Sequence, residues 1–561
     1  MTHHIDRPWI SQYAEGVPAE IELPTGSLVD MFEDTVRTFK SNVALDFFGS
    51  TTTYAELGML VSRAAEGLRK AGVGAGDRVA LVLPNCPQHV IAFYAILRLG
   101  AIVVEHNPLY TDREMRHQFE DHGAKVAIVW DKVGDRIHAM PADVAFDTVV
   151  AVDVTRAMPF GKRVALRLPI PKARAARNSL TASSKSSMPW EKLLNHRPVR
   201  RSVAKPQVDD LAVIQYTSGT TGTPKGAKLT HFNLHANALQ GRAWVPGMVP
   251  GKEVIYAVLP MFHAYGLTLC LTFAMNSGAR LVLLPKFDVD LVLDAAKSHP
   301  PTFLPAVPPI YERLATAAQK RKVDLTGIRF AISGAMNLPV STVELWEKVT
   351  GGYLVEGYGL TETSPVALGN PIGPSRKPGT VGVPFPSTEI RVVDPEDPSV
   401  DRKPGEKGEL LIRGPQVFQG YWQKPDETDK VMIEGGWFRT GDICTVDRDG
   451  FVTIVDRIKE LIITGGFNVS PSEVEDALRQ HSDVSDVAVV GLPIGGGGED
   501  VVAAVVLKSG APFDEKAMRD WCREHLTAYK VPKKIIVIDE LPKSLIGKVL
   551  RRAVREKLLA L

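Results

Sequence analysis

The sequence predicts an α/β protein with a large, multi-subdomain N-terminal domain built on parallel sheets and a small α+β domain at the C-terminus. The chain has 561 residues, several times the length of a usual domain. Strand, helix and strand patterns follow one another repeatedly in its first part. Near residues 456–460 this pattern gives way to a shorter segment with its own strands and helices. We therefore predict an N-terminal domain over residues 1–456, a linker over residues 457–460 and a C-terminal domain over residues 461–561.

The N-terminal pattern begins with a strand, a helix and a second strand. Residues 78–84 (RVALVLP) are a short apolar run, residues 88–99 show helical spacing of apolar side chains, and residues 101–104 are a second strand. This order implies a right-handed crossover and a parallel sheet. The pattern returns at residues 212–215, 254–259, 280–284 and 329–333. A small β-barrel-like part is expected near residues 380–456.

The C-terminal segment alternates helices and strands at closer spacing. The periodicity predicts helices over residues 473–479 and 515–525. It predicts strands over residues 487–490, 501–507 and 535–538. A charged linker joins this domain to the rest of the chain.

Composition and charge exclude several classes of function. The formal net charge of +2 is too small for a nucleic-acid-binding field over the whole surface. The four cysteines lie far apart, so a metal-type pair or a disulfide framework is not expected and a reducing cytoplasm is favoured. The first ten residues lack the apolar core of a signal peptide, and no window offers the roughly 18–20 apolar residues of a membrane span. We expect a cytoplasmic protein that is not integral to a membrane and binds no nucleic acid.

Residues 156–201 carry a local excess of positive charge. They hold 12 lysines and arginines against a single acid, Glu191, and Leu166, Leu168 and Ile170 are interleaved with the bases. One interpretation is a solvated surface loop, which is what charge runs usually are. The other is a docking patch for anionic lipid on the inner face of the cell membrane, at roughly 1 kcal/mol for each basic residue near the surface.

A loop rich in glycine and threonine is the strongest chemical signal in the chain. Residues 216–226 read YTSGTTGTPKG and follow the buried strand predicted at residues 212–215. Hydroxyls, a freed backbone and a lysine suit a loop that cradles phosphates. The spacing differs from GxxxxGK[ST], so this is not the ordinary P-loop. The alternative is a disordered polar linker.

This loop resembles the phosphate loop of the adenylate-forming superfamily, which includes acyl-CoA synthetases, luciferases and the adenylation domains of peptide synthetases. Further segments resemble that superfamily's motifs in the same order along the chain, and the similarity is greatest to the bacterial long-chain acyl-CoA synthetases. The segments are PMFHAYG at 260–266, EGYGLTETSP at 356–365, GPQVFQGYW at 414–422, WFRTGDI at 437–443, FVTIVDRIKE at 451–460, ITGGFNV at 463–469, LTAYKVPK at 526–533 and LPKSLIGKVLRR at 541–552.

The resemblance implies that the loop holds the phosphates of ATP and that Thr217 and Glu362 position Mg²⁺. A fatty carboxylate is already ionised near pH 7, so its attack on phosphorus needs positive charge rather than a base. The loop residues implied in phosphate binding are Thr217, Ser218, Gly219, Thr220, Thr221, Gly222 and Lys225.

The nucleoside is implied to lie against the later motifs. Tyr358 would stack on adenine, and Gly334 and Ala335 would let the base approach the backbone. Asp442, which alone would be read as a turn former, would bind the ribose hydroxyls with the help of Arg457. The remaining nucleotide-binding candidates implied by the motifs are Glu356, Gly357, Gly359, Thr361, which would contact the α-phosphate, Ile454 and Lys459.

The C-terminal domain is implied to be mobile about the linker, with Lys459 at the pivot. Lys548 would bridge the acyl carboxylate and the α-phosphate and leave after adenylation, although a lysine in a basic tail is usually just solvated. Gly465 and Gly466 would then line a channel for the pantetheine arm of coenzyme A; without the motif they would be read as a β-turn.

His263 lies in the motif that is implied to wall the acyl pocket. A histidine among aromatic residues is more often a packed pocket residue than a base, and the resemblance leaves open whether it shapes the pocket or gates between the two steps. Amino-acid-activating relatives place an aspartate here to pair with an ammonium group. A histidine in its place favours a carboxylic acid without an amine.

The expected activity is an ATP- and Mg²⁺-dependent long-chain fatty acid–CoA ligase that forms an acyl-adenylate and releases AMP. A medium-chain or aryl-acid CoA ligase, an acyl-AMP ligase that loads a carrier protein, and a catalytically silent nucleotide-dependent lipid-binding protein are the alternatives. The motif at residues 260–266 departs from that of some long-chain relatives because it lacks a tryptophan gate, and whether Tyr265 substitutes for one is left open. The acyl length and the oligomeric state, with a homodimer as one alternative, are left open.

Overall fold

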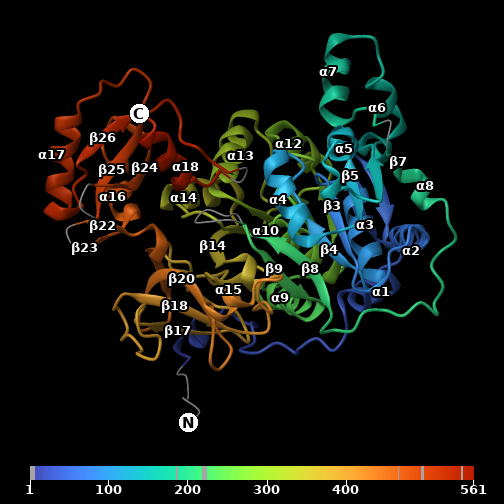
Figure 1. The fold of residues 1–561 in the computed structure, drawn as a ribbon, viewed down its shortest axis with the longest axis horizontal. Helices are drawn as coiled ribbons and strands as arrows, with labels where there is room; N and C mark the ends of the chain where they lie inside the picture. Colours follow the sequence, from blue (N-terminus) through green and yellow to red (C-terminus); the bar gives the residue numbers. More distant parts are fainter. Residues whose placement is uncertain (1–6, 185–186, 218–223, 465–466, 495–497, 545–546) are drawn as a thin grey trace. The chain divides into compact units, whose positions relative to one another are not determined.

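The computed structural model describes residues 7–184, 187–217, 224–464, 467–494, 498–544 and 547–561. These residues form two units (Figure 1). The first unit contains the described residues up to Thr217, with Pro224–Glu389 and Arg413–Gly436; the second contains Ile390–Ile412 and Trp437–Leu561. The second unit includes residues on both sides of residue 456, where we placed the domain boundary, so that boundary stays a prediction.

A seven-stranded sheet forms one half of the first unit. Its order is β7-β6-β5-β3-β4-β8-β9, and every neighbouring pair is parallel except β8 and β9. The strands are β3 (Arg78–Val82), β4 (Ile102–Glu105), β5 (Val126–Trp130), β6 (Thr148–Val152), β7 (Met188–Pro189), β8 (Leu211–Tyr216) and β9 (Gly226–Thr230). The predicted crossover is confirmed, because α3 (Pro87–Arg98) joins the parallel strands β3 and β4. The central strands are apolar runs because helices cover them, among them α3, α4 (Asp112–His122) and α5 (Asp131–His138). Helix α2 (Tyr54–Lys70) packs on α3.

A nine-stranded sheet forms the other half. Its order is β16-β15-β14-β13-β12-β10-β11-β1-β2, with antiparallel strands only at its two edges. The strands are β1 (Val43–Phe47), β2 (Ser50–Thr53), β10 (Val254–Ala257), β11 (Arg280–Leu283), β12 (Phe303–Ala306), β13 (Phe330–Ser333), β14 (Tyr353–Gly359), β15 (Val366–Gly369) and β16 (Val383–Pro384). Its helices include α1 (Leu28–Thr38), α9 (His231–Trp244), α12 (Val289–Ser298), α13 (Pro308–Arg321) and α14 (Val340–Thr350). The strands predicted near residues 254, 280 and 329 are confirmed as β10, β11 and β13.

The basic stretch is largely helical. It contains α6 (Phe160–Ala165), α7 (Pro171–Leu180) and α8 (Trp190–Leu194). Pro171 occupies the first position of α7, where its missing N–H costs no hydrogen bond. α6 and α7 lie beyond α5 at the β7 end of the seven-stranded sheet (Figure 1).

The second unit begins with an antiparallel sheet that contains β18 (Gly408–Arg413), β20 (Trp437–Val446) and β21 (Val452–Arg457). Its C-terminal part holds β22 (Ile462–Thr464), β23 (Phe467–Val469) and the sheet β24 (Val484–Pro493), β25 (Glu499–Leu507) and β26 (Lys534–Val537). Helices α16 (Pro471–Arg479), α17 (Glu515–His525) and α18 (Arg551–Leu559) flank that sheet. The two helices and three strands predicted for this segment are confirmed, and the α/β fold class with a smaller C-terminal unit is confirmed as a whole.

All four cysteines are buried and free. Across the described ranges, no helix combines the length and the apolar content needed to cross a bilayer.

Candidate active site

The predicted phosphate loop is closed at its base by a hairpin. β8 ends at Tyr216 and β9 begins at Gly226, and the two strands are antiparallel. The N–H of Thr217 donates to the carbonyl of Lys225 (2.9 Å), and the N–H of Lys225 donates to Oγ1 of Thr217 (3.2 Å). The loop residues Ser218, Gly219, Thr220, Thr221 and Gly222 lie outside the described residues. The hairpin therefore fixes where the loop begins and ends.

Lys225 is held by a carboxylate and an aromatic ring. Its ammonium forms an ion pair with Glu427 and lies 5.0 Å from the centroid of the Tyr421 ring. The hydrogen bond from Lys225 lowers the pKa of Glu427 to about 2. Lys225 is thus positioned by groups more than 190 residues along the chain, which the sequence did not reveal.

Glu362 lies in a short turn, η5 (Thr361–Thr363), that follows β14. Its side chain is buried, and its Oε1 accepts a hydrogen bond from the hydroxyl of Tyr421 (2.7 Å). The backbone N–H of Phe418 donates to the Glu362 carbonyl (2.9 Å). The segment GPQVFQGYW thus contributes Tyr421 and Phe418 as supports for Glu362. We quoted this segment for its resemblance but assigned none of its residues a role.

The donor set fits magnesium bound largely through a nucleotide. Where the chain is described, no group of three or more histidine, cysteine, aspartate or glutamate side chains could hold a metal ion. Mg²⁺ commonly takes one or two carboxylates and completes its shell with phosphate oxygens and water. A buried carboxylate at Glu362 and a hydroxyl at Thr217 are the hard oxygen donors that this ion prefers.

β14 carries the segment predicted to hold adenine. Burial raises the pKa of Glu356 to about 8, so this side chain is largely uncharged at neutral pH. Tyr358 pairs with Leu368 of β15, and Gly357 pairs with Gly369. A Cβ at Gly359 would lie 1.8 Å from the carbonyl oxygen of Pro365, so only glycine fits this turn. The segment is therefore a tightly constrained, weakly charged edge.

The aromatic motif at residues 260–266 packs against Gly334. The hydroxyl of Tyr265 donates to the carbonyl of Ile332 (2.6 Å), and a Cβ at Gly334 would lie 3.2 Å from the Tyr265 ring. Ala335 adopts a positive φ of 66°, which is unusual for a residue with a side chain. The structure thus brings together two segments that we assigned separately to the acyl pocket and to adenine.

His263 is half-buried at the start of α10 (Ala264–Gly266), and its Nδ1 accepts a hydrogen bond from the N–H of Tyr265 (3.3 Å). Gln215 of β8 donates to the carbonyl of Phe262 (2.8 Å) and thereby ties the phosphate-loop strand to this motif. We had not singled out Gln215, because a glutamine at the end of an apolar strand carries no signal in the sequence. The following segment Leu267–Thr272 is a fully buried π-helix, a form frequent at functional sites.

In the second unit, Asp442 and Arg457 face each other across β20 and β21. They are register partners, and Nε of Arg457 lies 3.0 Å from Oδ1 of the buried Asp442. Ile454 pairs with Cys444 in the same ladder and is half-buried. Lys459 is exposed in η6 (Ile458–Glu460). The structure thus joins the predicted ribose-binding pair.

Lys548 lies in the same unit, in a turn fixed by Ser544. The N–H of Lys548 donates to Oγ of Ser544 (3.2 Å), and the N–H of Ser544 donates to the carbonyl of Lys548 (2.7 Å). Burial, with the Arg457 guanidinium nearby, lowers the pKa of Lys548 to about 8. Asp442 is close enough to oppose that shift. Gly465 and Gly466 lie outside the described residues.

Arg551 connects the Lys548 segment to the linker and to α16. Its guanidinium donates to both carboxylate oxygens of Glu475 (2.9 and 2.8 Å) and to Oγ of Ser472 (2.8 Å). It also forms an ion pair with Glu460 and lies 3.7 Å from Oδ1 of Asp456. We missed this residue, because an arginine in a basic tail shows no partner until the chain folds.

The chain matches known proteins along almost its whole length. Residues 32–422 match the model of the AMP-binding enzyme family, and residues 473–548 match that of the AMP-binding enzyme C-terminal domain. The chain is 38% identical to the long-chain-fatty-acid–CoA ligase of Bacillus subtilis, with 98% of each chain covered.

Two solved structures show the same fold. ATP-bound MatB from Rhodopseudomonas palustris is 31% identical, with a TM-score of 0.79 over 94% of this chain and 98% of its own. The anthranilate CoA ligase AuaEII in complex with anthranoyl-AMP is 26% identical, with a TM-score of 0.81 over 96% of this chain and 99% of its own. Because the family model covers most of the sequence and the relatives align from end to end, this chain belongs to the AMP-binding enzyme family.

Proposed function

We propose that the protein is an ATP-dependent long-chain fatty acid–CoA ligase. The end-to-end similarity to a bacterial enzyme of that name carries the proposal. In the first step a carboxylate oxygen attacks the α-phosphorus of ATP; a phosphorus–oxygen bond forms and pyrophosphate leaves, giving an acyl-adenylate. In the second step the sulfur of coenzyme A attacks the acyl carbonyl and forms a carbon–sulfur bond, while its thiol proton is released to solvent. AMP leaves with the electrons of the broken carbon–oxygen bond.

In this proposal the phosphates and the nucleoside of ATP are bound by different residues. Mg²⁺, when bound by Thr217 and Glu362, neutralises phosphate charge. Lys225 and the loop 217–222 bind the phosphates, and Thr361 contacts the α-phosphate. The buried Asp442 accepts hydrogen bonds from the ribose, with Arg457 holding its carboxylate in place. Adenine binds against Tyr358 and the backbone of Gly334, Ala335, Glu356, Gly357 and Gly359.

Lys548 supplies the positive charge that the first step needs and withdraws before the second. Lys459 is the pivot about which the C-terminal domain turns between the two steps. Gly465 and Gly466 then line the path of pantetheine. A fixed cation aimed at developing charge stabilises the transition state more than the ground state, which is the source of the rate gain. Exclusion of water protects the adenylate from hydrolysis between the steps.

The acid is a plain alkyl carboxylate in this proposal. His263 replaces the aspartate that amino-acid-activating relatives carry, and a histidine lacks the negative charge that pairs with an ammonium group. Tyr265 is anchored by its hydroxyl to the backbone of β13, so it forms a fixed wall rather than a free gate. The buried helix Leu267–Thr272 lies directly behind this motif and supplies an apolar lining.

Purified protein should therefore activate palmitate better than decanoate, hexanoate or benzoate. Each methylene buried in an apolar tunnel contributes about 0.8 kcal/mol, or roughly a fourfold gain in kcat/KM, until the tunnel is filled. The measurement is AMP release with each acid, with coenzyme A and with a carrier-protein thiol as acceptors. A preference for benzoate, or transfer to the carrier protein alone, would contradict the proposal. Absence of AMP release with every acid would favour a lipid-binding protein without catalysis.

We further propose that the protein docks on anionic membranes through a surface formed by α6, α7 and the turn between them, called here the docking surface. Its apolar side chains are exposed: Phe160 (74%), Val164 (46%), Leu168 (49%) and Ile170 (49%). The bases of the same segment are Lys162, Arg163, Arg167, Lys172, Arg174 and Arg177. Exposed apolar residues rimmed by bases suit the boundary between acyl chains and anionic headgroups. A surface of this kind brings the enzyme to the membrane into which a long-chain fatty acid partitions.

Replacing Leu168 and Ile170 together by serine should weaken binding to anionic vesicles about tenfold, because two half-exposed side chains lose their contact with the acyl layer. Vesicle co-sedimentation at fixed ionic strength measures this. Val249→Ser with Val340→Ser is a matched control, since both valines are also half-exposed and lie outside the docking surface. Equal losses in the two double variants would show that this surface is not the membrane contact.

A further inference from the structure

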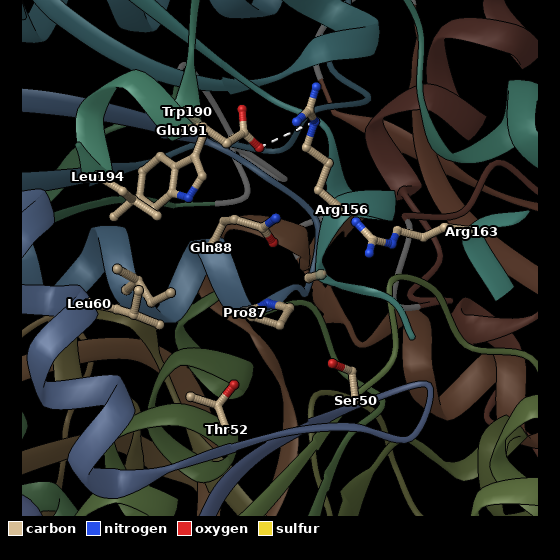
Figure 2. A pocket seen from close by; sticks show the side chains of 12 residues that line it. Ser50, Thr52, Leu60, Pro87, Gln88, Arg156, Arg163, Trp190, Glu191 and Leu194 are labelled. Carbon is tan, nitrogen blue, oxygen red and sulfur yellow. Dashed lines mark ion pairs between the residues drawn. The ribbon is translucent and has the colours of Figure 1, made fainter. Parts of the chain in front are cut away.

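A pocket of about 380 Å³ opens between the first helices of the molecule and the basic stretch (Figure 2). None of its residues takes part in the proposed active site. The lining comes from β2, α2, α3, the short helix η3 (Val154–Ala157), α6 and α8, which together extend from residue 50 to residue 194. The residues are Ser50, Thr52, Leu60, Pro87, Gln88, Ile91, Arg156, Ala157, Arg163, Trp190, Glu191 and Leu194.

The pocket has an apolar side and a polar side. In Figure 2 the side chains of Leu60, Trp190 and Leu194 lie together on one side. The guanidinium of Arg163 and the amide of Gln88 point toward the middle of the pocket, and Ser50 lies below them in this view. A ligand that fits this lining has both an apolar portion and a polar, hydrogen-bonding portion.

Arg163 is the cation that remains available in the pocket. Arg156 turns to Glu191, with 3.3 Å between Nε and Oε1, and lies 3.8 Å from Asp153, so its charge is compensated. Arg163 forms no ion pair with any described residue, and its Nε is buried without a hydrogen-bond partner among them. Its guanidinium lies 5.7 Å from the ring centroid of Phe160 on the docking surface. The pocket therefore offers one oriented, uncompensated positive charge next to the proposed membrane contact.

Gln88 adds an acceptor that the protein does not satisfy. The side chain is 5% exposed, and its Nε2 donates to the carbonyl of Asp153 (3.4 Å). Its Oε1 is buried and finds no hydrogen-bond partner among the described residues. A buried carbonyl oxygen without a donor is unfavourable, so the ligand that suits this position brings a hydroxyl or an N–H.

The start of α3 reinforces the preference for an anion. Pro87 and Gln88 form its first turn, and Cys86 at the N-cap makes no side-chain capping bond. The amino end of a 12-residue helix carries partial positive charge, which adds to that of Arg163. Serine and threonine hydroxyls on β2 can both donate and accept.

We propose that this pocket binds the headgroup of an anionic phospholipid that carries free hydroxyls, of which phosphatidylglycerol is the representative. The phosphate pairs with Arg163, a glycerol hydroxyl donates to Oε1 of Gln88, and the apolar wall takes the first carbons of the lipid. The volume lies at the lower end of the range of small-molecule sites, which suits a headgroup rather than a whole lipid. The proposal rests on the docking surface proposed above and adds headgroup selectivity to it.

The test compares vesicles of equal surface charge. Full-length protein is co-sedimented with phosphatidylcholine vesicles that contain the same mole fraction of either phosphatidylglycerol or phosphatidylserine. Both lipids carry one net negative charge, but only the glycerol headgroup supplies free, uncharged hydroxyls. The N–H donor of phosphatidylserine is a cationic ammonium, which the nearby Arg163 guanidinium and the amino end of α3 disfavour. The expected result is severalfold tighter binding to phosphatidylglycerol. Equal binding to the two lipids would overturn the headgroup pocket and leave the docking surface standing.

Two variants separate the pocket from the surface. Arg163→Gln and Arg167→Gln each remove one base from the docking surface, and each should weaken binding to both lipids about fivefold, from roughly 1 kcal/mol for each charge. Only Arg163→Gln should also abolish the preference for phosphatidylglycerol. Gln88→Leu should abolish that preference without weakening binding to phosphatidylserine. If the melting curve of Gln88→Leu shows that it is unfolded, Thr52→Val repeats the test at a half-buried position of the edge strand β2. A preference that survives in all three pocket variants would overturn the proposal.

A competition experiment shows whether the phosphate bound in the pocket belongs to a lipid headgroup or is free inorganic phosphate. Glycerol 1-phosphate should displace the protein from phosphatidylglycerol vesicles to the level seen with phosphatidylserine, whereas inorganic phosphate at the same ionic strength should not. Displacement by inorganic phosphate to the same extent would show a free-phosphate site and overturn the lipid assignment. Absence of binding to either anionic vesicle would instead refute the docking surface on which the inference rests.

Discussion

Replacing Lys548 by methionine should reduce acyl-adenylate formation by about 10²- to 10³-fold, the usual cost of losing one preorganised charged or hydrogen-bonding group at a transition state. Methionine keeps the length and the apolar stem of the side chain but removes its charge. Transfer of a preformed acyl-adenylate to coenzyme A should be nearly unchanged, because the proposal withdraws Lys548 before that step. Pyrophosphate exchange measures the first step, and acyl-CoA formation from synthetic acyl-adenylate measures the second.

The pH dependence of the same step gives a second readout. The pKa of Lys548 is lowered to about 8, and the charged form is the one below that value. The adenylation rate of the unaltered protein should therefore fall as the pH rises through about 8, and this inflection should vanish in Lys548→Met. The second step should lack it in both proteins.

Lys543→Met is the matched control for Lys548→Met. Lys543 lies five positions earlier in the same motif, is half-exposed and pairs with Asp486 (2.7 Å). A surface pair of this kind contributes little, so adenylation should stay within a factor of a few. Equal losses in both lysine variants, or a large loss of thioester formation in Lys548→Met, would contradict the role assigned to Lys548.

Replacing Arg551 by methionine should destabilise the second unit by about 3 kcal/mol. The change leaves the buried carboxylates of Glu475 and Asp456 without their shared cation, and loss of one member of a buried ion pair costs about 3–5 kcal/mol. The low end of that range applies because Glu475 keeps a hydrogen bond from the N–H of Val489 (2.9 Å) and an ion pair with Arg479 (3.4 Å). Hydrogen exchange in α16 and β24 measures the local effect without assuming that the whole chain unfolds in one step.

Arg552→Met provides the comparison at the neighbouring position. Arg552 is exposed and pairs with the exposed Glu556 one turn along α18 (3.0 Å). Such a pair is worth at most about 0.5 kcal/mol, so exchange in α16 should be unaffected. Identical exchange in the two arginine variants would show that the Arg551 contacts do not stabilise this unit.

The periodic elements could be predicted from the sequence because they depend on neighbours in the chain. The run at residues 78–84, the helix after it and the strand at residues 101–104 are present as β3, α3 and β4, with ends shifted by one or two residues. Ends shift because the last backbone hydrogen bond of a helix or a strand ladder, rather than apolar spacing, decides where an element stops. The glycine- and threonine-rich order of residues 216–226 likewise identified a loop after a strand, and that strand, β8, is present.

The basic stretch shows where the sequence left two interpretations open. Charge and interleaved leucines are equally compatible with a solvated loop and with a docking patch. The structure shows helices α6 and α7 with Phe160, Leu168 and Ile170 exposed among the bases. Whether a side chain is exposed depends on which other segments pack against it, and the sequence of one segment alone does not carry that information.

By itself the sequence determined the fold class, the family motifs and the side chains available for chemistry, because composition, periodicity and motif spacing are local. Only the tertiary structure decided which groups support those side chains. Tyr421 reaches Glu362 from 59 residues away, Arg551 reaches Glu475 across 76, and Lys225 meets Glu427 across 202. The pocket around Arg163 and Gln88 draws on six separate elements. The physical reason is that burial and hydrogen-bond partners arise from packing between distant segments. This packing lowers the pKa of Lys548 and leaves Oε1 of Gln88 without a donor among the described residues.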